Sequence, residues 1–261
     1  MVINSLMHAL GQEQAIFRVF NQCIFENDRV AAFCSPVKTQ QVPYWNSAYL
    51  KRPEEPLNRD DLRGLNRAYS QRGIKPHIIS TDIRAKKLSA DIHTYHFRGA
   101  HMLGSDREVI KDQSSPVTVR SFESFDGQVM PAFDMLMRAV FGMKDELMAY
   151  FIERVVELAS LMPAQIWIAY NVSGEPCGFV NTFQTEDGVN FVFNYAVDAA
   201  VQRLGIGTRL MRELVKGSTN PLYLFTNNIN VSAKIMPRTG FEDIGNVYLV
   251  PLDIYAEHHV E

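Results

Sequence analysis

The segment that most constrains the fold is Tyr195–Leu210, in which an apolar strand passes through a short loop directly into a helix. The loop reads Gln202-Arg-Leu-Gly-Ile-Gly207. Two glycines beside a helix start permit backbone torsions that other residues resist, and they let a ligand approach the chain closely. The first N–H groups of a helix have no partner within it, and the helix dipole adds partial positive charge. The loop is therefore either a glycine-containing turn or a site for phosphate or pyrophosphate.

Two familiar phosphate-binding loops do not fit this segment. A P-loop requires Gly-Lys-Ser/Thr, but Gly207 is followed by Thr208 and Arg209. A dinucleotide-binding fingerprint requires a small residue three positions after Gly207, where Leu210 stands.

The segments around the loop predict an α+β fold, with a mixed sheet flanked by helices. Asp187-Gly188 between alternating apolar residues indicates a hairpin, and with the strand before it an antiparallel meander. Strands are expected at 117–119, 166–170, 177–185, 189–197 and 221–225, with a closing strand pair around Phe241 and 248–250, and helices at 128–141, 144–160, 208–216 and 231–238.

The polar stretch Lys111–Pro116 divides the chain into two expected domains, 1–112 and 116–261. The first domain predicts a similar order of elements, which indicates a degenerate internal duplication. Its predicted helices are 6–25, 60–71 and 83–91, and its predicted strands are 29–34, 44–50, 77–80 and 94–97. In place of the glycine loop it has Lys51-Arg-Pro-Glu-Glu-Pro56, where prolines lack N–H donors and glutamates repel phosphate.

The spacing Gln202-x-x-Gly205-x-Gly207 resembles the Gln/Arg-x-x-Gly-x-Gly/Ala signature of the GNAT superfamily of acetyl-CoA-dependent N-acetyltransferases. The meander before the loop, the helix after it and Gly240-Phe241 at the last corner also resemble that family. The resemblance covers about residues 116–253. It implies a tandem of a degenerate and a complete GNAT-like domain.

The resemblance also implies a site for acetyl-CoA as co-substrate. The backbone of Val197 would bind the pantetheine arm, and backbone N–H groups of the loop would hold the pyrophosphate. Arg203 and Arg209 are either solvated or contribute charge near the phosphates. Asn228 and Asn230 would contact the pantetheine, or they act as turn formers or a helix N-cap. The implied cofactor-binding residues are Val197, Gln202, Arg203, Leu204, Gly205, Ile206, Gly207, Thr208, Asn228 and Asn230.

The catalytic groups are not identified by the sequence. In family members the general acid is commonly a tyrosine four residues before the glycine of the Gly-Phe corner, and this chain has Met236 there. Either the thiolate leaves without an acid, or another tyrosine such as Tyr195 or Tyr223 reaches the sulfur, or catalysis is lost. Asn194 and Tyr195 are candidates to line the acceptor side, and no base is assigned.

We therefore expect transfer of an acetyl group to a primary amine of a small molecule or protein by direct attack on the thioester. A catalytically silent acyl-CoA-binding regulatory module is the alternative, and an enzyme that uses a longer acyl-CoA is a further one.

Composition restricts the partners and the setting. With 26 basic and 29 acidic residues the net charge is −3, which argues against nucleic acid and weakly favours small or cationic amines. No apolar run is long enough to span a membrane, and no secretory signal is evident. The three cysteines indicate buried thiols in a cytoplasmic protein. His93, His96 and His101 lack regular ligand spacing, so no metal is expected; a homodimer is a possible assembly.

Overall fold

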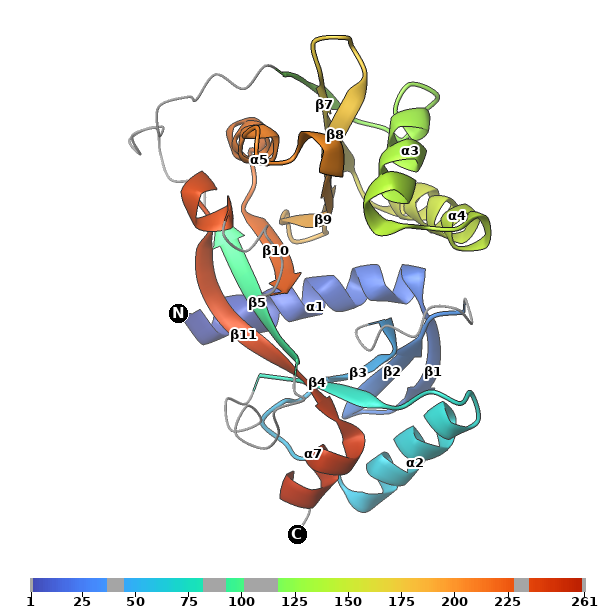
Figure 1. Cartoon of the computed structure of the whole chain (residues 1–261). Coiled ribbons are helices and arrows are strands. Elements are labelled where there is room, and N and C mark those ends of the chain that lie inside the picture. The colour runs from blue at the N-terminus through green and yellow to red at the C-terminus, as the bar shows by residue number, and fades with distance from the viewer. Residues whose placement is uncertain (1, 37–44, 82–92, 101–116, 228–234, 260–261) are drawn as a thin grey trace. The chain divides into compact units, whose positions relative to one another are not determined.

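The computed structural model has a mixed α+β fold, in which strands that pair in parallel and antiparallel directions are flanked by helices (Figure 1). The structure describes residues 2–36, 45–81, 93–100, 117–227 and 235–259. Unit 1 contains Met1–His96 and Gly245–Glu261, and unit 2 contains Phe97–Ile244. Strands β5 (His93–Ala100) and β11 (Glu242–Pro251) each cross the boundary between the units.

Unit 2 holds the sheet that carries the glycine loop. Its strands β6, β7, β8 and β9 pair in antiparallel order, and β9 pairs with β10 in parallel. The strands span Thr118–Phe122 (β6), Ala164–Tyr170 (β7), Pro176–Gln184 (β8), Asn190–Val197 (β9) and Leu222–Asn227 (β10). The predicted hairpin between β8 and β9 is confirmed: Gly188 adopts a positive φ of 74°, and the Thr185 N–H donates to the Val189 carbonyl at 2.9 Å.

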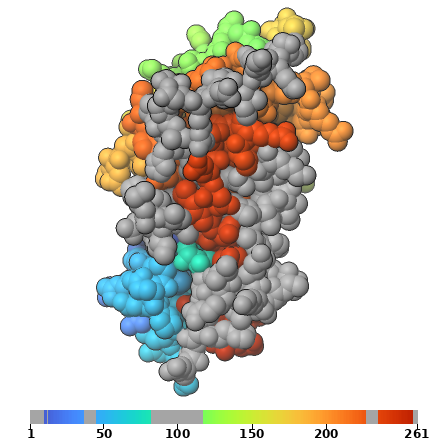
Figure 2. Space-filling model, turned by 90° about the vertical axis from the view of Figure 1, so that its left-hand side faces the viewer, coloured from blue at the N-terminus to red at the C-terminus, as the bar shows by residue number. Residues whose placement is uncertain are grey.

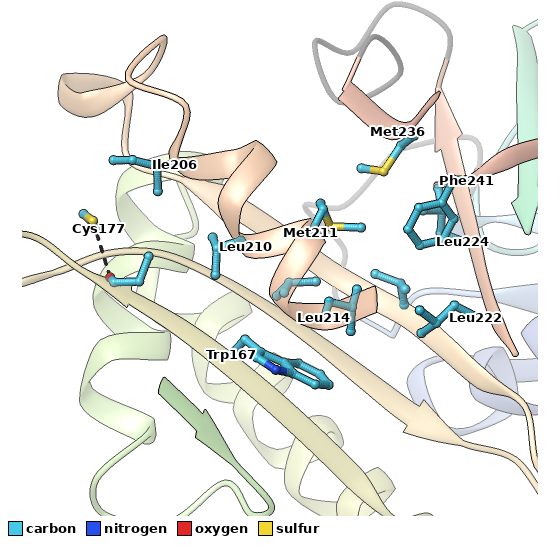
Figure 3. Packing of buried hydrophobic residues seen from close by; sticks show 13 residues of the cluster. Trp167, Cys177, Ile206, Leu210, Met211, Leu214, Leu222, Leu224, Met236 and Phe241 are labelled. Atoms are coloured by element: carbon cyan, nitrogen blue, oxygen red, sulfur yellow. Dashed lines mark hydrogen bonds between the residues drawn. The ribbon is translucent and has the colours of Figure 1, made fainter. Parts of the chain in front are cut away.

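Three α-helices of unit 2 pack against this sheet: α3 (Met130–Phe141), α4 (Asp145–Leu161) and α5 (Ile206–Gly217). Beneath α3 and α4 lies an aromatic cluster in which Phe133 contacts Phe151 and Phe179. Beneath α5 lies an apolar core in which Leu210, Met211 and Leu214 pack over residues of the sheet (Figure 3). Alternate residues of the strands therefore serve two cores, as the period of a strand requires.

Unit 1 repeats the same order on a smaller scale. Strands β1 and β2 are antiparallel, β2 and β3 are antiparallel, and β3 and β4 are parallel, as are β9 and β10. Helix α2 connects β3 to β4 just as α5 connects β9 to β10. The elements span Val2–Phe20 (α1), Gln22–Glu26 (β1), Val30–Cys34 (β2), Ser47–Leu50 (β3), Arg59–Ser70 (α2), His77–Ser80 (β4) and Leu252–His259 (α7). The repetition supports the predicted internal duplication.

The faces of α2 show how the core of unit 1 forms. Leu65 and Tyr69 are fully buried, and the Tyr69 hydroxyl donates to the Phe33 carbonyl at 3.0 Å. The opposite face, with Arg63 and Arg67, is exposed to solvent. Figure 2 shows light-blue residues of the first half of the chain at the molecular surface. Tyr49 and Trp45 pack against Phe17 of α1.

The last strand differs from the prediction. A single strand, β11, stands where a closing pair was expected, and its Tyr248–Pro251 segment pairs antiparallel with β4 in unit 1. The residues 245–261 thus group with unit 1, whereas the sequence-based division places them in the second domain. That division, into 1–112 and 116–261, stays a prediction.

Other elements differ from the sequence predictions in smaller ways. The predicted helix 6–25 is helix α1 followed by strand β1, and α7 was not predicted. Cys34 and Cys177 are buried as expected, but Cys23 is exposed, so the prediction of three buried thiols is wrong for that residue. The predicted helix 83–91 and the first half of 231–238 lie outside the described residues, and Met236–Thr239 form a 3-10 helix.

Candidate functional site

The glycine loop joins the carboxyl end of β9 to the N-terminus of α5 in a strained, exposed conformation. A short 3-10 turn, Ala199–Val201, follows the strand. Arg203 then adopts a positive φ of 69°, as no other described non-glycine residue does, and Gly205 follows at 79°. A non-glycine residue in the left-handed region costs about 1–2 kcal/mol and is often found at functional sites.

The side chain of Gln202 fixes this loop to the strand. Its Nε2 donates to the Val197 carbonyl at 3.3 Å. This contact connects the first residue of the motif with the strand residue whose backbone was expected to contact the pantetheine. The Gln202 side chain therefore holds the loop against the end of β9.

The N-terminus of α5 has no side-chain cap. Gly205 occupies the N-cap position, and the Arg209 N–H donates to the Gly205 carbonyl at 3.0 Å as the first turn closes. The N–H groups of Ile206, Gly207 and Thr208 precede this first bond, so helix geometry leaves them without intrahelical partners. They and the helix dipole present a positive end to which an anion can bind.

The corresponding helix of unit 1 is closed to anions. Asn58 caps α2 by accepting the N–H groups of Asp60 and Asp61, each at 2.9 Å. Asp61 in turn accepts the Asn58 N–H at 3.0 Å, which completes a capping box. Two carboxylates therefore stand at the position where α5 has a bare terminus.

Tyr195 lies beneath the start of α5, next to Gly207. Its hydroxyl is buried and has no hydrogen-bond partner among the described residues. Burial raises the pKa of Tyr195 above its ordinary value. A phenol so placed is a weaker acid than tyrosine in water, which argues against it as the proton donor.

Asn194 lies on the α3 and α4 side of the sheet, at an irregularity of β9. Between Asn194 and Val192, β9 carries one more residue than the facing strand β8, which is a β-bulge. The Asn194 Nδ2 donates to the Asn181 Oδ1 at 3.0 Å, and both residues are buried. Sequence reasoning missed Asn181; its signal was a polar residue at the centre of an apolar strand.

The other residues that the sequence singled out for catalysis or for pantetheine binding are either buried in unit 2 or lie outside the described residues. Tyr223 is buried on β10, next to the α5-facing residues Leu222 and Leu224. Asn228 and Asn230 lie outside the described residues. Met236 is 2% exposed and belongs to the same apolar core as Leu210 and Met211 of α5 (Figure 3).

Metals and membranes receive no support from the described parts of the chain. Within these parts, no group of three or more His, Cys, Asp or Glu side chains is placed to hold a metal ion. None of the described helices combines the length and apolar character that crossing a bilayer demands.

A comparison with known protein families gives one match, which lies in the second half of the chain. Residues 134–241 match the model of the acetyltransferase (GNAT) family, a range that includes β9, the loop and α5. No curated protein matches the sequence.

Solved structures share the fold over most of the chain. A GCN5-related N-acetyltransferase from Kribbella flavida aligns with a TM-score of 0.60 at 13% identity, over 93% of each chain. A tandem GNAT protein from the clavulanic acid biosynthesis pathway aligns with a TM-score of 0.57 at 9% identity, over 85% of this chain and 77% of that one. A conserved protein of unknown function from Staphylococcus epidermidis aligns with 0.58 at 14% identity, over 88% and 93%.

At these identities the likeness concerns the fold, and the family match carries the assignment of the domain. The likeness of fold and the family match both agree with the exposed glycine loop and the N-terminus of α5 that no side chain caps. The chain therefore carries an acetyltransferase domain of the GNAT family, at residues 134–241.

Proposed function

We propose that this protein transfers an acetyl group from acetyl-CoA to a primary amine. The observation that carries the proposal is the bare N-terminus of α5, preceded by left-handed Arg203 and Gly205, within the matched GNAT domain. In unit 1 the Asn58 side chain caps the equivalent terminus and two aspartates stand in its first turn, so the difference lies where a pyrophosphate would bind.

The proposed binding mode follows the loop. Backbone N–H groups of residues 203–208 hold the pyrophosphate, and the Thr208 hydroxyl adds a donor. Arg203 is exposed and free to add positive charge, whereas Arg209 already pairs with Glu213 at 3.1 Å. The backbone of Val197 contacts the pantetheine; Asn228 and Asn230 remain candidates for the same role.

The proposed reaction is direct attack of a neutral amine on the thioester carbonyl. The new C–N bond forms, the C–S bond breaks, and CoA leaves as a thiolate. The proton lost by the amine passes to solvent, because no described acid or base is positioned to act. Asn194 and Tyr195 stay candidates for the acceptor side, and Tyr223 stays a candidate for the group that reaches the sulfur.

Binding is tested with a matched pair of variants at Gly205. Asn and Asp both tolerate the left-handed conformation, and an added Cβ at this position meets no atom within 4 Å. Gly205→Asn should therefore keep acetyl-CoA binding, while Gly205→Asp sets a negative charge against the pyrophosphate and weakens it. Calorimetry gives the dissociation constants.

A thermal-shift titration adds a second readout. Acetyl-CoA at a hundredfold excess over its Kd stabilises the folded state by about 2.7 kcal/mol, which is about 5–10 °C for a chain of this size. No shift in a folded wild type, or equal binding by both Gly205 variants, would refute the site.

A catalytically silent acyl-CoA-binding module is the second candidate. Met236, buried where the family commonly has a tyrosine, favours it. Thiol release from acetyl-CoA in the presence of a panel of small and cationic primary amines separates the two, because turnover with any amine excludes the silent module. A series of longer acyl-CoA esters in the same assay defines the acyl preference. The cytoplasmic location and the homodimer stay predictions from the sequence.

A further inference from the structure

The bulge in β9 lies where that strand stops pairing with β10. The described pairing of these two strands ends at Val192, although both strands continue beyond it. On the opposite edge of β9, Asn194 faces Asn181 of β8, and Phe193 is the extra residue between Asn194 and Val192. Bulges often redirect side chains next to active sites. This bulge directly precedes the segment that ends at Val197, whose backbone is proposed to contact the pantetheine.

An aromatic layer surrounds the bulge on the face of the sheet that α3 and α4 cover (Figure 1). Phe193 is half-buried, and its ring lies 6.2 Å from the ring of Phe151 and 5.8 Å from that of Phe183. Because the side chains of a strand alternate between its faces, Asn181 points to the same side as Phe183. The amide pair Asn181–Asn194 therefore lies within an aromatic layer, where incomplete hydrogen bonding lowers stability. Polar groups that lower stability in this way are expected at functional sites.

The two amides differ in their access to solvent. Asn181 is fully buried, whereas Asn194 is 9% exposed. The Asn194 Nδ2 donates to the Asn181 Oδ1 at 3.0 Å, and the Asn181 Nδ2 is sealed without a partner in the described parts of the chain. The Asn194 Oδ1 also accepts no hydrogen bond from the described residues, but it is not among the unpaired atoms that are sealed from solvent. The pair therefore presents one accessible acceptor oxygen.

An accessible amide oxygen with a fixed direction suits an amino group. The hydrogen bond to Asn181 holds the Asn194 amide in one orientation, with its nitrogen inward and its oxygen outward. This oxygen accepts an N–H from a primary amine, whether the amine is neutral or protonated. A carboxylate in its place would favour the protonated amine and raise its pKa. A neutral amide carries no such charge, so it allows the proton loss that must precede attack on a thioester.

We propose that the Asn194 Oδ1 accepts a hydrogen bond from the amino group of the acceptor, and that Asn181 is the positioning residue that keeps this oxygen outward. The inference rests on the proposed acetyl transfer and assigns one contact within it. The half-buried ring of Phe193 next to Asn194 adds apolar surface at the same place. The acceptor is accordingly a primary amine on an apolar or aromatic body, for which benzylamine is the probe.

The first experiment follows the side-chain amide NMR signals of the full-length wild type. The signals of Asn194 are assigned by their absence from Asn194→Asp. Benzylamine is titrated with and without CoA, which has no acyl group to transfer. The Asn194 signals should shift along one saturable curve. Unchanged signals would overturn the inference, even in a protein that acetylates benzylamine.

Turnover of acetyl-CoA with benzylamine is measured separately, by thiol release. A shift of the Asn194 signals without turnover would refute the proposed transfer and support the amine contact. Turnover without a shift would support the transfer and refute the contact. The two proposals therefore fail by different results.

A first variant tests the positioning role of Asn181. Asn181→Leu removes the acceptor of the Asn194 Nδ2, so the Asn194 amide is free to rotate. The KM for benzylamine should then rise about three- to tenfold, the range expected for one neutral hydrogen bond, while the KM for acetyl-CoA stays unchanged. A smaller folded fraction would lower the apparent kcat and leave both KM values as they are, so the amine KM separates positioning from a loss of fold.

A conservative variant and a matched control complete the test. Asn181→Asp keeps an oxygen acceptor in the same shape, so the amine KM should stay within about twofold of the wild type. Asn190→Leu removes another buried amide of β9, whose Nδ2 donates to the Ser218 Oγ at 2.7 Å, and should lower stability without changing the amine KM. An unchanged amine KM in Asn181→Leu, or an equal rise in Asn181→Asp or Asn190→Leu, would overturn the role of Asn181.

Discussion

The hydroxyl of Tyr195 occupies the space that a side chain at Gly207 would need. A Cβ built at Gly207 lies 1.9 Å from the Tyr195 oxygen and 3.2 Å from its Cζ. The second glycine of the motif is therefore required by a contact inside the protein, whether or not a ligand approaches. The first glycine differs, since Gly205 has open space around it and a positive φ.

This contact predicts a double-mutant cycle. Gly207→Ala should destabilise the fold by about 1–3 kcal/mol, because the added methyl overlaps the phenol oxygen. Tyr195→Phe should be neutral or slightly stabilising, since it removes a buried hydroxyl without a partner. The double variant should recover most of the loss in urea unfolding. Gly217→Ala is the control, because its Cβ makes only ordinary contact with Trp167 at 3.4 Å.

Replacement of Arg203 by glycine should stabilise the protein. The left-handed conformation of arginine destabilises the folded state by about 1–2 kcal/mol, and glycine removes this strain. Glycine also loses more conformational freedom on folding, which offsets about 0.5–1 kcal/mol of the gain. We expect the free energy of unfolding, measured by chemical denaturation, to rise by about 0.5–1 kcal/mol. Arg67→Gly, in the exposed face of α2, should instead cost about 1 kcal/mol. Two changes of the same sign would contradict the strain at Arg203.

The carboxylate of Glu26 should titrate near pH 2. Arg18 and Lys51 contact its Oε1 at 2.6 Å and 2.7 Å and lower its pKa from 4.5 to about 2. Because the folded pKa is depressed, the stability from this cluster is complete above pH 4.5 and is lost as the pH falls toward 2. The side chain is partly exposed, so that contribution stays below about 1 kcal/mol. NMR titration of the Glu26 carboxyl in the wild type and Arg18→Gln should show a higher pKa in the variant; an unchanged pKa would exclude Arg18 as its main cause.

The buried amides of Asn181 and Asn194 should behave as one unit. The Asn181 Nδ2 already has no partner among the described residues, so the hydrogen bond to its Oδ1 is the contact that couples the pair. Replacing Asn194 by leucine leaves the Asn181 oxygen unpaired as well, and replacing Asn181 leaves the Asn194 Nδ2 unpaired, at a cost of about 1–3 kcal/mol for each newly unpaired group. Replacing both leaves no unpaired amide, so the double variant should be closer to the wild type than either single one. Unfolding free energies of the four proteins measure the coupling, and additive losses would mean that the 3.0 Å hydrogen bond contributes nothing.

The parts of the fold that sequence could predict are those determined locally. Asp187-Gly188 determines the β8–β9 hairpin, and Gly205 with Gly207 marks the start of α5. Each depends on backbone torsions within a few residues. The family signature then adds the order of elements across the second half.

The parts that sequence could not predict depend on partners far away in the chain. The pairing of Tyr248 with Ser80 joins residues from opposite ends of the sequence, and no local pattern encodes it. Glu13 sits in a helix where an acidic residue normally faces water, so its burial beside Tyr49 had no signal. The core position of Met236 emerges only from packing around α5.

The pairing of β11 with β4 also has a consequence for how the chain is made. During translation Ser80 is synthesised about 160 residues before Gly245. Unit 1 therefore lacks its last strand until those residues have been added. At about 5–20 residues per second that delay is roughly 8–30 s, far longer than a small sheet needs to form. During this time one edge of β4 lacks the neighbour it will have. The first half of the protein is thus the first to be synthesised and among the last to be completed.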